Sequence, residues 1–219
     1  FPRSRIGLVL RTDGTTASDE GEISDIFNDY FASVFTVDDG ENPQLNMRTE
    51  SRLSAVTFTP ELVSKTLKTL KNSASVGPDG IPNVLLKNCY YTLALPLCHI
   101  FDLSLKSQRL PQEWKSSFVT PIHKKGPTNQ PKNYRPISIT SCCCRVMERI
   151  INKELISYLL TNHLISEQQH GFLPLRSTCT NLLESVYDWS IAIQEKKHTD
   201  IIYFDFQKHS TPSRTQSSQ

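Results

Sequence analysis

The side chain most suited to chemistry is Asp205, which lies in an apolar run near the end of the sequence. The run Ile201-Ile202-Tyr203-Phe204-Asp205-Phe206 is apolar on both sides, which predicts a buried central strand. A carboxylate there costs on the order of several kcal/mol unless it is paired or binds a metal. Because Mg²⁺ prefers carboxylate oxygens, Asp205 is a candidate metal ligand. The alternative is an Asp at the strand end that is hydrogen-bonded or solvated.

A second candidate site is a group of three cations, Lys124, Lys125 and Arg135. Two short apolar runs, 118–122 and 134–139, flank a polar loop that contains Gly and Pro, and this pattern predicts a β-hairpin. The hairpin would carry all three cations, which could then clamp a triphosphate during nucleotidyl transfer. The alternative is an exposed hairpin whose charges serve only solubility.

A third candidate is a polar segment just before a predicted helix. Ser177 or Thr178 is suited to cap that helix, and Arg176 is suited to contact a nucleic-acid backbone. His170 has the chemistry of a general base, although a single His is more often structural. The segment comprises Gln169, His170, Gly171, Phe172, Arg176, Ser177 and Thr178.

Apolar residues at helical spacing predict the elements that position these side chains. Thr59-Pro60-Glu61 is typical of a helix start, with Thr as the cap and Pro in the first turn. In the third helix we expect Leu93, Leu97, Ile100, Phe101 and Leu105 to face inward. A fifth helix is marked by Leu182, Val186, Trp189 and Ile193. The fold class is therefore α+β, mostly helical with one basic hairpin. The helices are expected at about 23–35, 60–71, 84–107, 142–162 and 178–195.

Length and charge limit the number of domains, the class of protein and the kind of partner. The 219 residues suffice for one domain of good size or two small ones, and the composition excludes a membrane protein, a collagen-like chain and a fully disordered chain. The net charge of +2 conceals −6 over residues 1–50 and +9 over residues 51–150. We place a boundary in the aperiodic stretch 38–54. The basic middle points to a phosphate-bearing partner, or else to solvated surface lysines.

Cysteine usage indicates a reducing compartment. The six Cys show no CxxC pair, and three of them are consecutive at 142–144, which suits neither a disulfide framework nor a zinc site. We therefore expect an intracellular protein, nuclear or cytoplasmic, with reduced thiols and no disulfide-linked partner. No membrane span is expected, since no apolar run reaches about 18 residues.

Five ordered stretches resemble motifs of one family, the reverse transcriptases of non-LTR retrotransposons of the jockey/RTE-like kind. They match SxGPDGIP, LPxxWK with PIxKKG, NYRPIS, QxGFR with RST, and the start of YlDFxKAFD. In this chain they are Ser75-Val76-Gly77-Pro78-Asp79-Gly80-Ile81-Pro82, Leu110-Pro111-Gln112-Glu113-Trp114-Lys115 with Pro121-Ile122-His123-Lys124-Lys125-Gly126, Asn133-Tyr134-Arg135-Pro136-Ile137-Ser138, Gln169-His170-Gly171-Phe172 with Arg176-Ser177-Thr178, and Tyr203-Phe204-Asp205-Phe206-Gln207-Lys208.

The resemblance implies a domain plan and a set of roles. Residues 1–55 would be an acidic connector, 56–180 the polymerase fingers, and 181–208 the start of the palm with its first strand. Lys124 or Lys125 and Arg135 would meet the phosphates of the incoming nucleotide, Asp205 would be the first catalytic carboxylate for two Mg²⁺ ions, and Gln169 to Thr178 would hold the template. Leu173 stands where the family usually has Arg. The implied partners are an RNA template, a DNA primer and deoxynucleoside triphosphates.

The sequence departs from the family after Lys208, where His209-Ser210-Thr211 replaces Ala-Phe-Asp. One inserted base restores a family-like frame, so we interpret 209–219 as a disordered, out-of-frame tail. No Tyr-x-Asp-Asp follows, so we expect this chain to be inactive alone and residues 201–204 to be poorly covered. The alternatives are a non-catalytic module that binds RNA or an RNA–DNA hybrid, or a relic without function.

Overall fold

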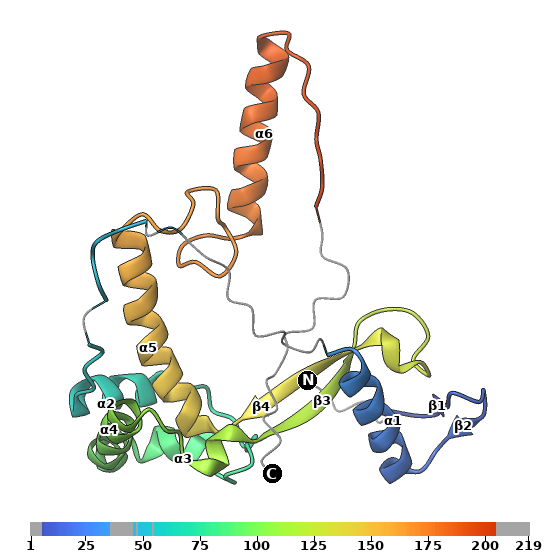
Figure 1. Cartoon of the computed structure of the whole chain (residues 1–219), viewed down its shortest axis with the longest axis vertical. Helices are drawn as coiled ribbons and strands as arrows, with labels where there is room; N and C mark the ends of the chain where they lie inside the picture. Colours follow the sequence, from blue (N-terminus) through green and yellow to red (C-terminus); the bar gives the residue numbers. More distant parts are fainter. Residues whose placement is uncertain (1–5, 36–45, 47, 54, 205–219) are drawn as a thin grey trace.

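The computed structural model describes residues 6–35, 46, 48–53 and 55–204. It is a mixed α+β structure, mostly helical, with two small antiparallel hairpins (Figure 1). Asp205, Phe206 and the tail 209–219 lie outside the described residues. The elements are β1 (Val9–Leu10), β2 (Thr16–Ala17), α1 (Glu20–Ser33), α2 (Pro60–Lys68), α3 (Asn83–Asn88), α4 (Tyr90–Ser107), η1 (Gln112–Lys115), β3 (Ser117–His123), η2 (Pro131–Asn133), β4 (Tyr134–Thr140), α5 (Cys142–Thr161) and α6 (Thr178–Gln194).

The main core lies between α2, α3, α4 and α5. Helix α2 begins as predicted, because the Thr59 hydroxyl accepts a hydrogen bond of 3.2 Å from the Leu62 N–H and Pro60 occupies the first turn. Its apolar face packs against α4 and α5. The buried cluster is Phe58, Val63, Leu67, Leu70, Leu86, Ala94, Leu97, Cys98, Phe101, Cys142, Cys143, Val146, Met147 and Ile150.

The third predicted helix is in fact two helices. Cys89 has a non-helical backbone (φ −97°, ψ 21°) and separates α3 from α4. Apolar periodicity continues through this point without Gly or Pro, so the pattern contained no signal for the break. Leu97 and Phe101 face inward as predicted, whereas Ile100 and Leu105 are exposed, which corrects the predicted inner face.

The Gly-Pro-Asp-Gly turn links the helical core to the β3–β4 hairpin. A Cβ on Gly77 would lie 2.6 Å from the Thr140 carbonyl oxygen, so only glycine allows this approach. The Ser141 hydroxyl donates a 2.5 Å hydrogen bond to Asp79 Oδ2 and also caps α5 by accepting from the Cys144 N–H at 3.3 Å. The turn therefore holds the junction at which β4 ends and α5 begins.

The C-terminal part of the described chain is little buried. Helix α6 forms as predicted but stands away from the rest of the structure, and none of its residues is buried (Figure 1). The apolar residues that mark this helix are open to solvent, since Leu182, Val186 and Ile193 are 61%, 50% and 76% exposed. A strand was predicted over 201–206, and its described residues, 201–204, form no strand. Their side chains are exposed, which confirms the expectation that they are poorly covered.

Candidate nucleic-acid interface

The β3–β4 hairpin places two of the predicted cations at one end. Arg135 pairs with Ile122 across the ladder, and the Lys124 N–H donates to the Asn133 carbonyl at 2.8 Å, so the pairing extends one step past β3. Lys124 and Arg135 are therefore diagonal neighbours on adjacent strands. Lys125 follows in the loop, and all three side chains are exposed. The structure brings the predicted cations onto one hairpin end, near the loop at the lower right of Figure 1.

The loop that joins the strands is held by its own side chains. The Asn133 amide donates to the Pro127 carbonyl at 2.7 Å, and the Tyr134 hydroxyl donates to the Thr128 carbonyl at 2.6 Å. The His123 ring contacts the Gly126 carbonyl at 2.9 Å, and Gly126 has a positive φ of 83°. These bonds order the loop, so its cations project from a defined backbone.

Residues 6–35, called here the acidic leader, pack against this hairpin end. Phe27 of α1 contacts Tyr134 edge-on with ring centroids 4.9 Å apart, and the Leu10 N–H donates to the Asn129 carbonyl at 2.8 Å. Tyr134 joins a small core with Val9, Ala17, Ile23, Phe27 and Phe31, where burial raises the pKa of its hydroxyl. Sequence reasoning missed this contact, although the apolar face of α1 signalled that some partner must cover it. The predicted separation of residues 1–55 from the rest of the chain, as a connector, stays a prediction.

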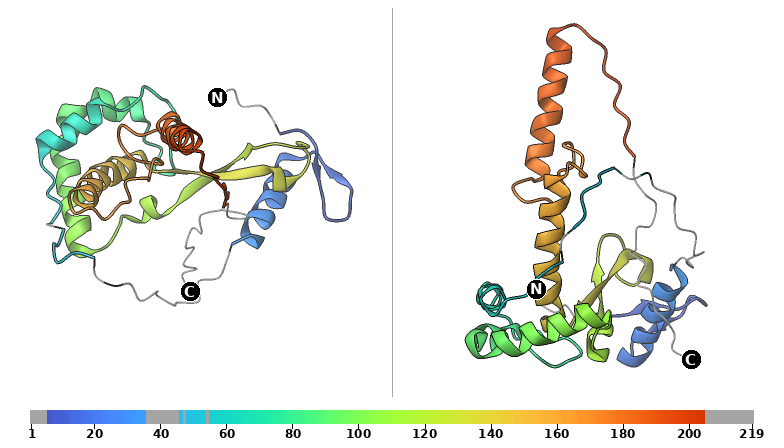
Figure 2. Two further views of the ribbon diagram at one scale, coloured as in Figure 1. Left: turned by 90° about the horizontal axis from the view of Figure 1, so that it is seen from above. Right: turned by 60° about the vertical axis from the view of Figure 1, so that its left-hand side comes forward.

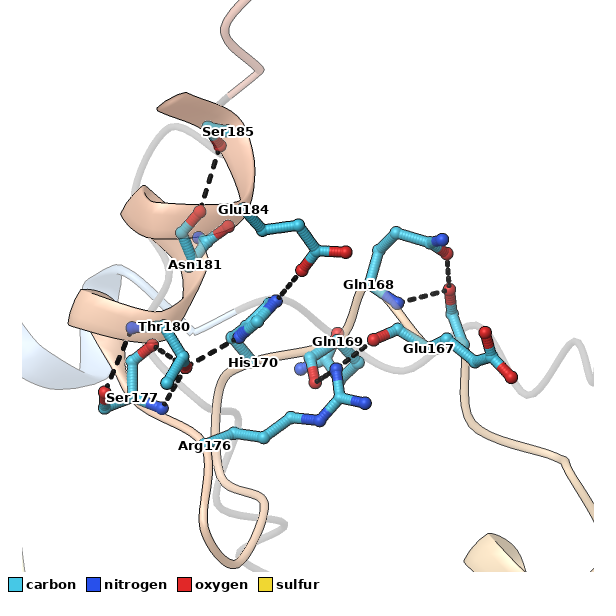
Figure 3. A network of polar contacts seen from close by, with 11 residues as sticks. Glu167, Gln168, Gln169, His170, Arg176, Ser177, Thr180, Asn181, Glu184 and Ser185 are labelled. Atoms are coloured by element: carbon cyan, nitrogen blue, oxygen red, sulfur yellow. Dashed lines mark hydrogen bonds and ion pairs between the residues drawn. The ribbon is translucent and has the colours of Figure 1, made fainter. Parts of the chain in front are cut away.

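Inside the third predicted segment, His170 is held at both ring nitrogens. Nε2 lies 2.6 Å from Glu184 Oε2 and Nδ1 lies 2.9 Å from Thr180 Oγ1 (Figure 3). Its side chain is 9% exposed. Both nitrogens are thus engaged with α6, which favours the structural interpretation of this histidine over that of a free base.

Other predicted residues of this segment bind one another. Ser177 forms a capping box with Thr180, each side chain accepting from the backbone N–H of the other at 3.2 and 2.9 Å, so Ser177 rather than Thr178 caps α6. The Arg176 guanidinium donates to the carbonyls of Glu167 and Gln169. The Gln169 amide donates to the Gly171 carbonyl at 3.0 Å. These bonds shape the loop shown in Figure 3.

Phe172 and Leu175 differ from the rest of this loop. Both side chains are fully exposed, and both residues have φ of 62°, a left-handed backbone that costs a non-glycine residue about 1 kcal/mol. Exposed apolar side chains on a strained backbone indicate a contact surface. The loop follows the C-terminus of α5, whereas β4 leads into the N-terminus of α5, so this segment and the hairpin cations form two separate candidate sites (Figure 1).

Comparison with known proteins shows a similarity to polymerases of mobile elements. Residues 122–209 match the family model for reverse transcriptase (RNA-dependent DNA polymerase). The chain is 26% identical over 205 residues to the probable RNA-directed DNA polymerase from transposon X-element of Drosophila melanogaster, covering 92% of this chain and 22% of that protein. It is 28% identical over 149 residues to the corresponding protein from transposon BS, covering 68% and 16%.

The RNA-directed DNA polymerase from mobile element jockey of the same species is 28% identical over 157 residues, or 71% of this chain and 17% of that protein. Over this part of its length the chain is similar to the reverse transcriptases of non-LTR retrotransposons. It covers part of the reverse transcriptase region and spans about a fifth or less of the length of these curated relatives.

Asp205, the residue predicted to bind Mg²⁺, lies outside the described residues. Within residues 6–35, 46, 48–53 and 55–204, no three His, Cys, Asp or Glu side chains lie close enough to hold a metal ion. A single carboxylate has the right donor chemistry for Mg²⁺ but supplies only part of a coordination shell. Over the same residues no helix is long and apolar enough to cross a membrane.

The six cysteines of this chain are all free thiols. Cys142, Cys143 and Cys144 are buried at the start of α5, and burial, reinforced by nearby acidic groups, raises the pKa of Cys143 and of Cys144 to about 12. Such thiols are protonated and unreactive at neutral pH. The predicted burial of the consecutive cysteines is confirmed.

Proposed function

We propose that this chain forms the fingers and the beginning of the palm of a polymerase that copies RNA into DNA by two-metal nucleotidyl transfer. Three features support the proposal. The motifs follow the family's order, the hairpin gathers Lys124, Lys125 and Arg135, and residues 51–150 carry a net charge of +9. The hairpin is the observation that carries the proposal, because it brings Arg135 to the same end of a single element as Lys124 and Lys125.

The hairpin cations would bind the triphosphate of the incoming nucleotide. A guanidinium offers paired donors in a plane that match two phosphate oxygens, and an ammonium acts as a point charge. Arg135 lies on β4 and Lys124 one step past the end of β3, so a triphosphate could contact both. The packed leader and the ordered loop keep this end of the hairpin in place, which limits the entropy lost on binding.

The segment from Gln169 to Thr178 would hold the template. Gln169, Gly171 and Arg176 shape the loop, Ser177 anchors it to α6 with Thr178 in the first turn, and Phe172 presents an open aromatic face to a base. Asp205 would contribute one carboxylate to a Mg²⁺ site, and bound Mg²⁺ would supply activation of a primer hydroxyl and neutralisation of phosphate charge. A two-metal site needs further carboxylates, so this chain is proposed to be inactive by itself.

Nucleotide binding tests the hairpin. Titration with a fluorescent deoxynucleoside triphosphate should show binding that Arg135→Gln weakens on the order of tenfold, the effect of losing a charged hydrogen-bonding partner. Lys106→Gln, on the exposed end of α4, is the charge-matched control and should bind normally. Equal binding by both variants would contradict the proposed role. A primer-extension assay with Mg²⁺ should give no product, and any extension would contradict the proposed inactivity.

A second candidate function is non-catalytic binding of RNA or an RNA–DNA hybrid. The observation that favours it is the pair of exposed, strained residues Phe172 and Leu175, which form a contact surface apart from the hairpin. Hybrid binding that depends on salt, without measurable nucleotide binding, would select this function. If neither hybrid binding nor nucleotide binding is detected at low salt, the chain is best interpreted as a relic of a decayed element.

A further inference from the structure

A groove of about 740 Å³ runs between α2, α5 and residues 172–174 of the loop that follows α5. Lys65 lies on the α2 side, and Arg149 and Lys153 lie on the α5 side. From Arg149 to Leu160 its α5 wall spans eleven steps of the helix, or about 16 Å. The right-hand view of Figure 2 shows α2 near the base of α5 and the loop near its top. The groove is therefore long rather than round.

The charges on this groove are predominantly positive and largely unpaired. Glu154 is its one carboxylate against the three cations. Across the described chain, neither Lys65 nor Lys153 has an ion-pair partner within 4.0 Å, and Arg149 makes a single contact, its Nη1 donating to Thr69 Oγ1 at 3.3 Å. Since Arg149 and Lys153 are four residues apart, they share a face of α5 about 6 Å apart along its axis. Cations without partners on two opposing walls fit an extended polyanion.

An aromatic residue stands at the edge of the same groove. Phe172 contributes to the lining although its side chain is fully exposed, and its backbone is held at a φ of 62°. Successive bases of a single strand stack on such rings, and this contact tolerates any base sequence. The combination of a cationic track and an open aromatic ring distinguishes single-stranded nucleic acid from an acidic peptide, which would need only the cations.

We propose that this groove binds single-stranded nucleic acid, with Lys65, Arg149 and Lys153 on phosphates and Phe172 stacked on a base. The inference rests on the proposed function and deepens it, because it extends template contact from the loop onto α2 and α5. Neither helix was assigned such a role from the sequence. The groove is separate from the hairpin cations, so the two sites can be tested independently.

The test of the cationic track is the salt dependence of oligonucleotide binding. Fluorescein-labelled rU12 and dT12 are titrated by anisotropy, without Mg²⁺ or nucleotide, across a range of salt concentrations. The triple variant Lys65→Gln, Arg149→Gln, Lys153→Gln should flatten the log–log salt slope by about 2, because each lost phosphate contact removes about 0.7. The control Lys106→Gln, Arg109→Gln, Lys115→Gln removes the same charge elsewhere and should leave the slope unchanged.

The test of the aromatic contact compares two exposed aromatic residues. Phe172→Ala should weaken binding on the order of tenfold, the effect of one lost stacking contact, and Phe172→Tyr should retain it. Tyr91→Ala is the control, because Tyr91 lies on α4, is exposed and does not line the groove, and it should bind like the unaltered chain. Circular dichroism confirms that each variant is folded, and cross-linking of bromouracil-substituted strands should map to the peptide that contains Phe172.

Each outcome decides for or against the groove. Equal salt slopes for the two triple variants, or equal binding by Phe172→Ala and Tyr91→Ala, overturns the proposal. Displacement of rU12 by poly-glutamate with no effect of Phe172→Ala overturns it in favour of an acidic peptide. Tighter binding of rU12 than of dT12 supports an RNA template, and equal binding supports contact through phosphates and bases alone. A negative result together with loss of nucleotide binding in Arg135→Gln would reject the groove but retain the proposed function.

Discussion

Helices α4 and α6 have similar lengths and similarly spaced apolar residues, yet their surroundings differ completely. Helix α4 buries Leu97 and Phe101 against α2 and neighbouring residues, whereas α6 buries none of its residues in the described chain. Local signals are present in both, including the capping box that starts α6. The comparison teaches that periodicity and caps define a helix, but only a partner surface makes it part of a core.

The largest expected contrast is between two matched truncations. Leu67→Ala removes a fully buried side chain of α2 and should lower the free energy of unfolding by about 2–5 kcal/mol. Leu182→Ala acts on α6, where the side chain is 61% exposed, and should change it by less than about 0.5 kcal/mol. Chemical denaturation of both variants measures the difference. Equal losses would mean that α6 is packed as tightly as α2 in solution.

The junction between the helical core and the hairpin should be nearly as sensitive. Gly77→Ala places a methyl group 2.6 Å from the Thr140 carbonyl oxygen, which a backbone atom cannot easily avoid, so we expect a loss of about 1–3 kcal/mol. Gly7→Ala is the control, because its Cβ would meet nothing within 4 Å. Thermal unfolding compares the two. Unchanged stability of Gly77→Ala would show that the turn does not hold β4 against α5 as described.

Thiol reactivity should differ between the exposed helix α6 and the buried start of α5. Iodoacetamide at pH 8 should modify Cys179 of α6, which is exposed, well before Cys143 and Cys144, whose pKa values of about 12 keep them protonated. Because these pKa values are raised above the ordinary 9.0, the unfolded chain loses those protons first, and stability should fall as pH rises from 9 toward 12. Mass spectrometry follows the modification. Early labelling of Cys143 would contradict the packing of α5.

The smallest contrast concerns the two helix caps. Thr59→Ala removes the cap of α2 and should lower global stability by about 1 kcal/mol, since α2 is part of the core. Ser177→Ala removes the equivalent bond in α6 and should speed amide exchange in that helix alone, with global stability unchanged. Hydrogen exchange measured by mass spectrometry distinguishes local from global opening. A global loss from Ser177→Ala would show that α6 unfolds together with the core.

Much of the candidate site followed from the sequence. Local patterns predicted the hairpin, which places Lys124 near Arg135, and the caps at Thr59 and Ser177. The structure contains the hairpin and both caps. The break at Cys89 could not be predicted because no breaker residue marks it. The groove was equally hidden, since Lys65, Arg149 and Phe172 are far apart in sequence and meet only through packing.

The sequence by itself determined where the helices and the basic hairpin form, because capping, apolar spacing and turn residues act over a few neighbours. It also carried the resemblance to reverse transcriptases, through motifs that keep their order. Only the tertiary structure decided that the leader packs on Tyr134, that Asp79 holds the cap of α5, and that α6 remains uncovered. The physical reason is that burial depends on which surfaces meet, and such contacts join residues far apart along the chain.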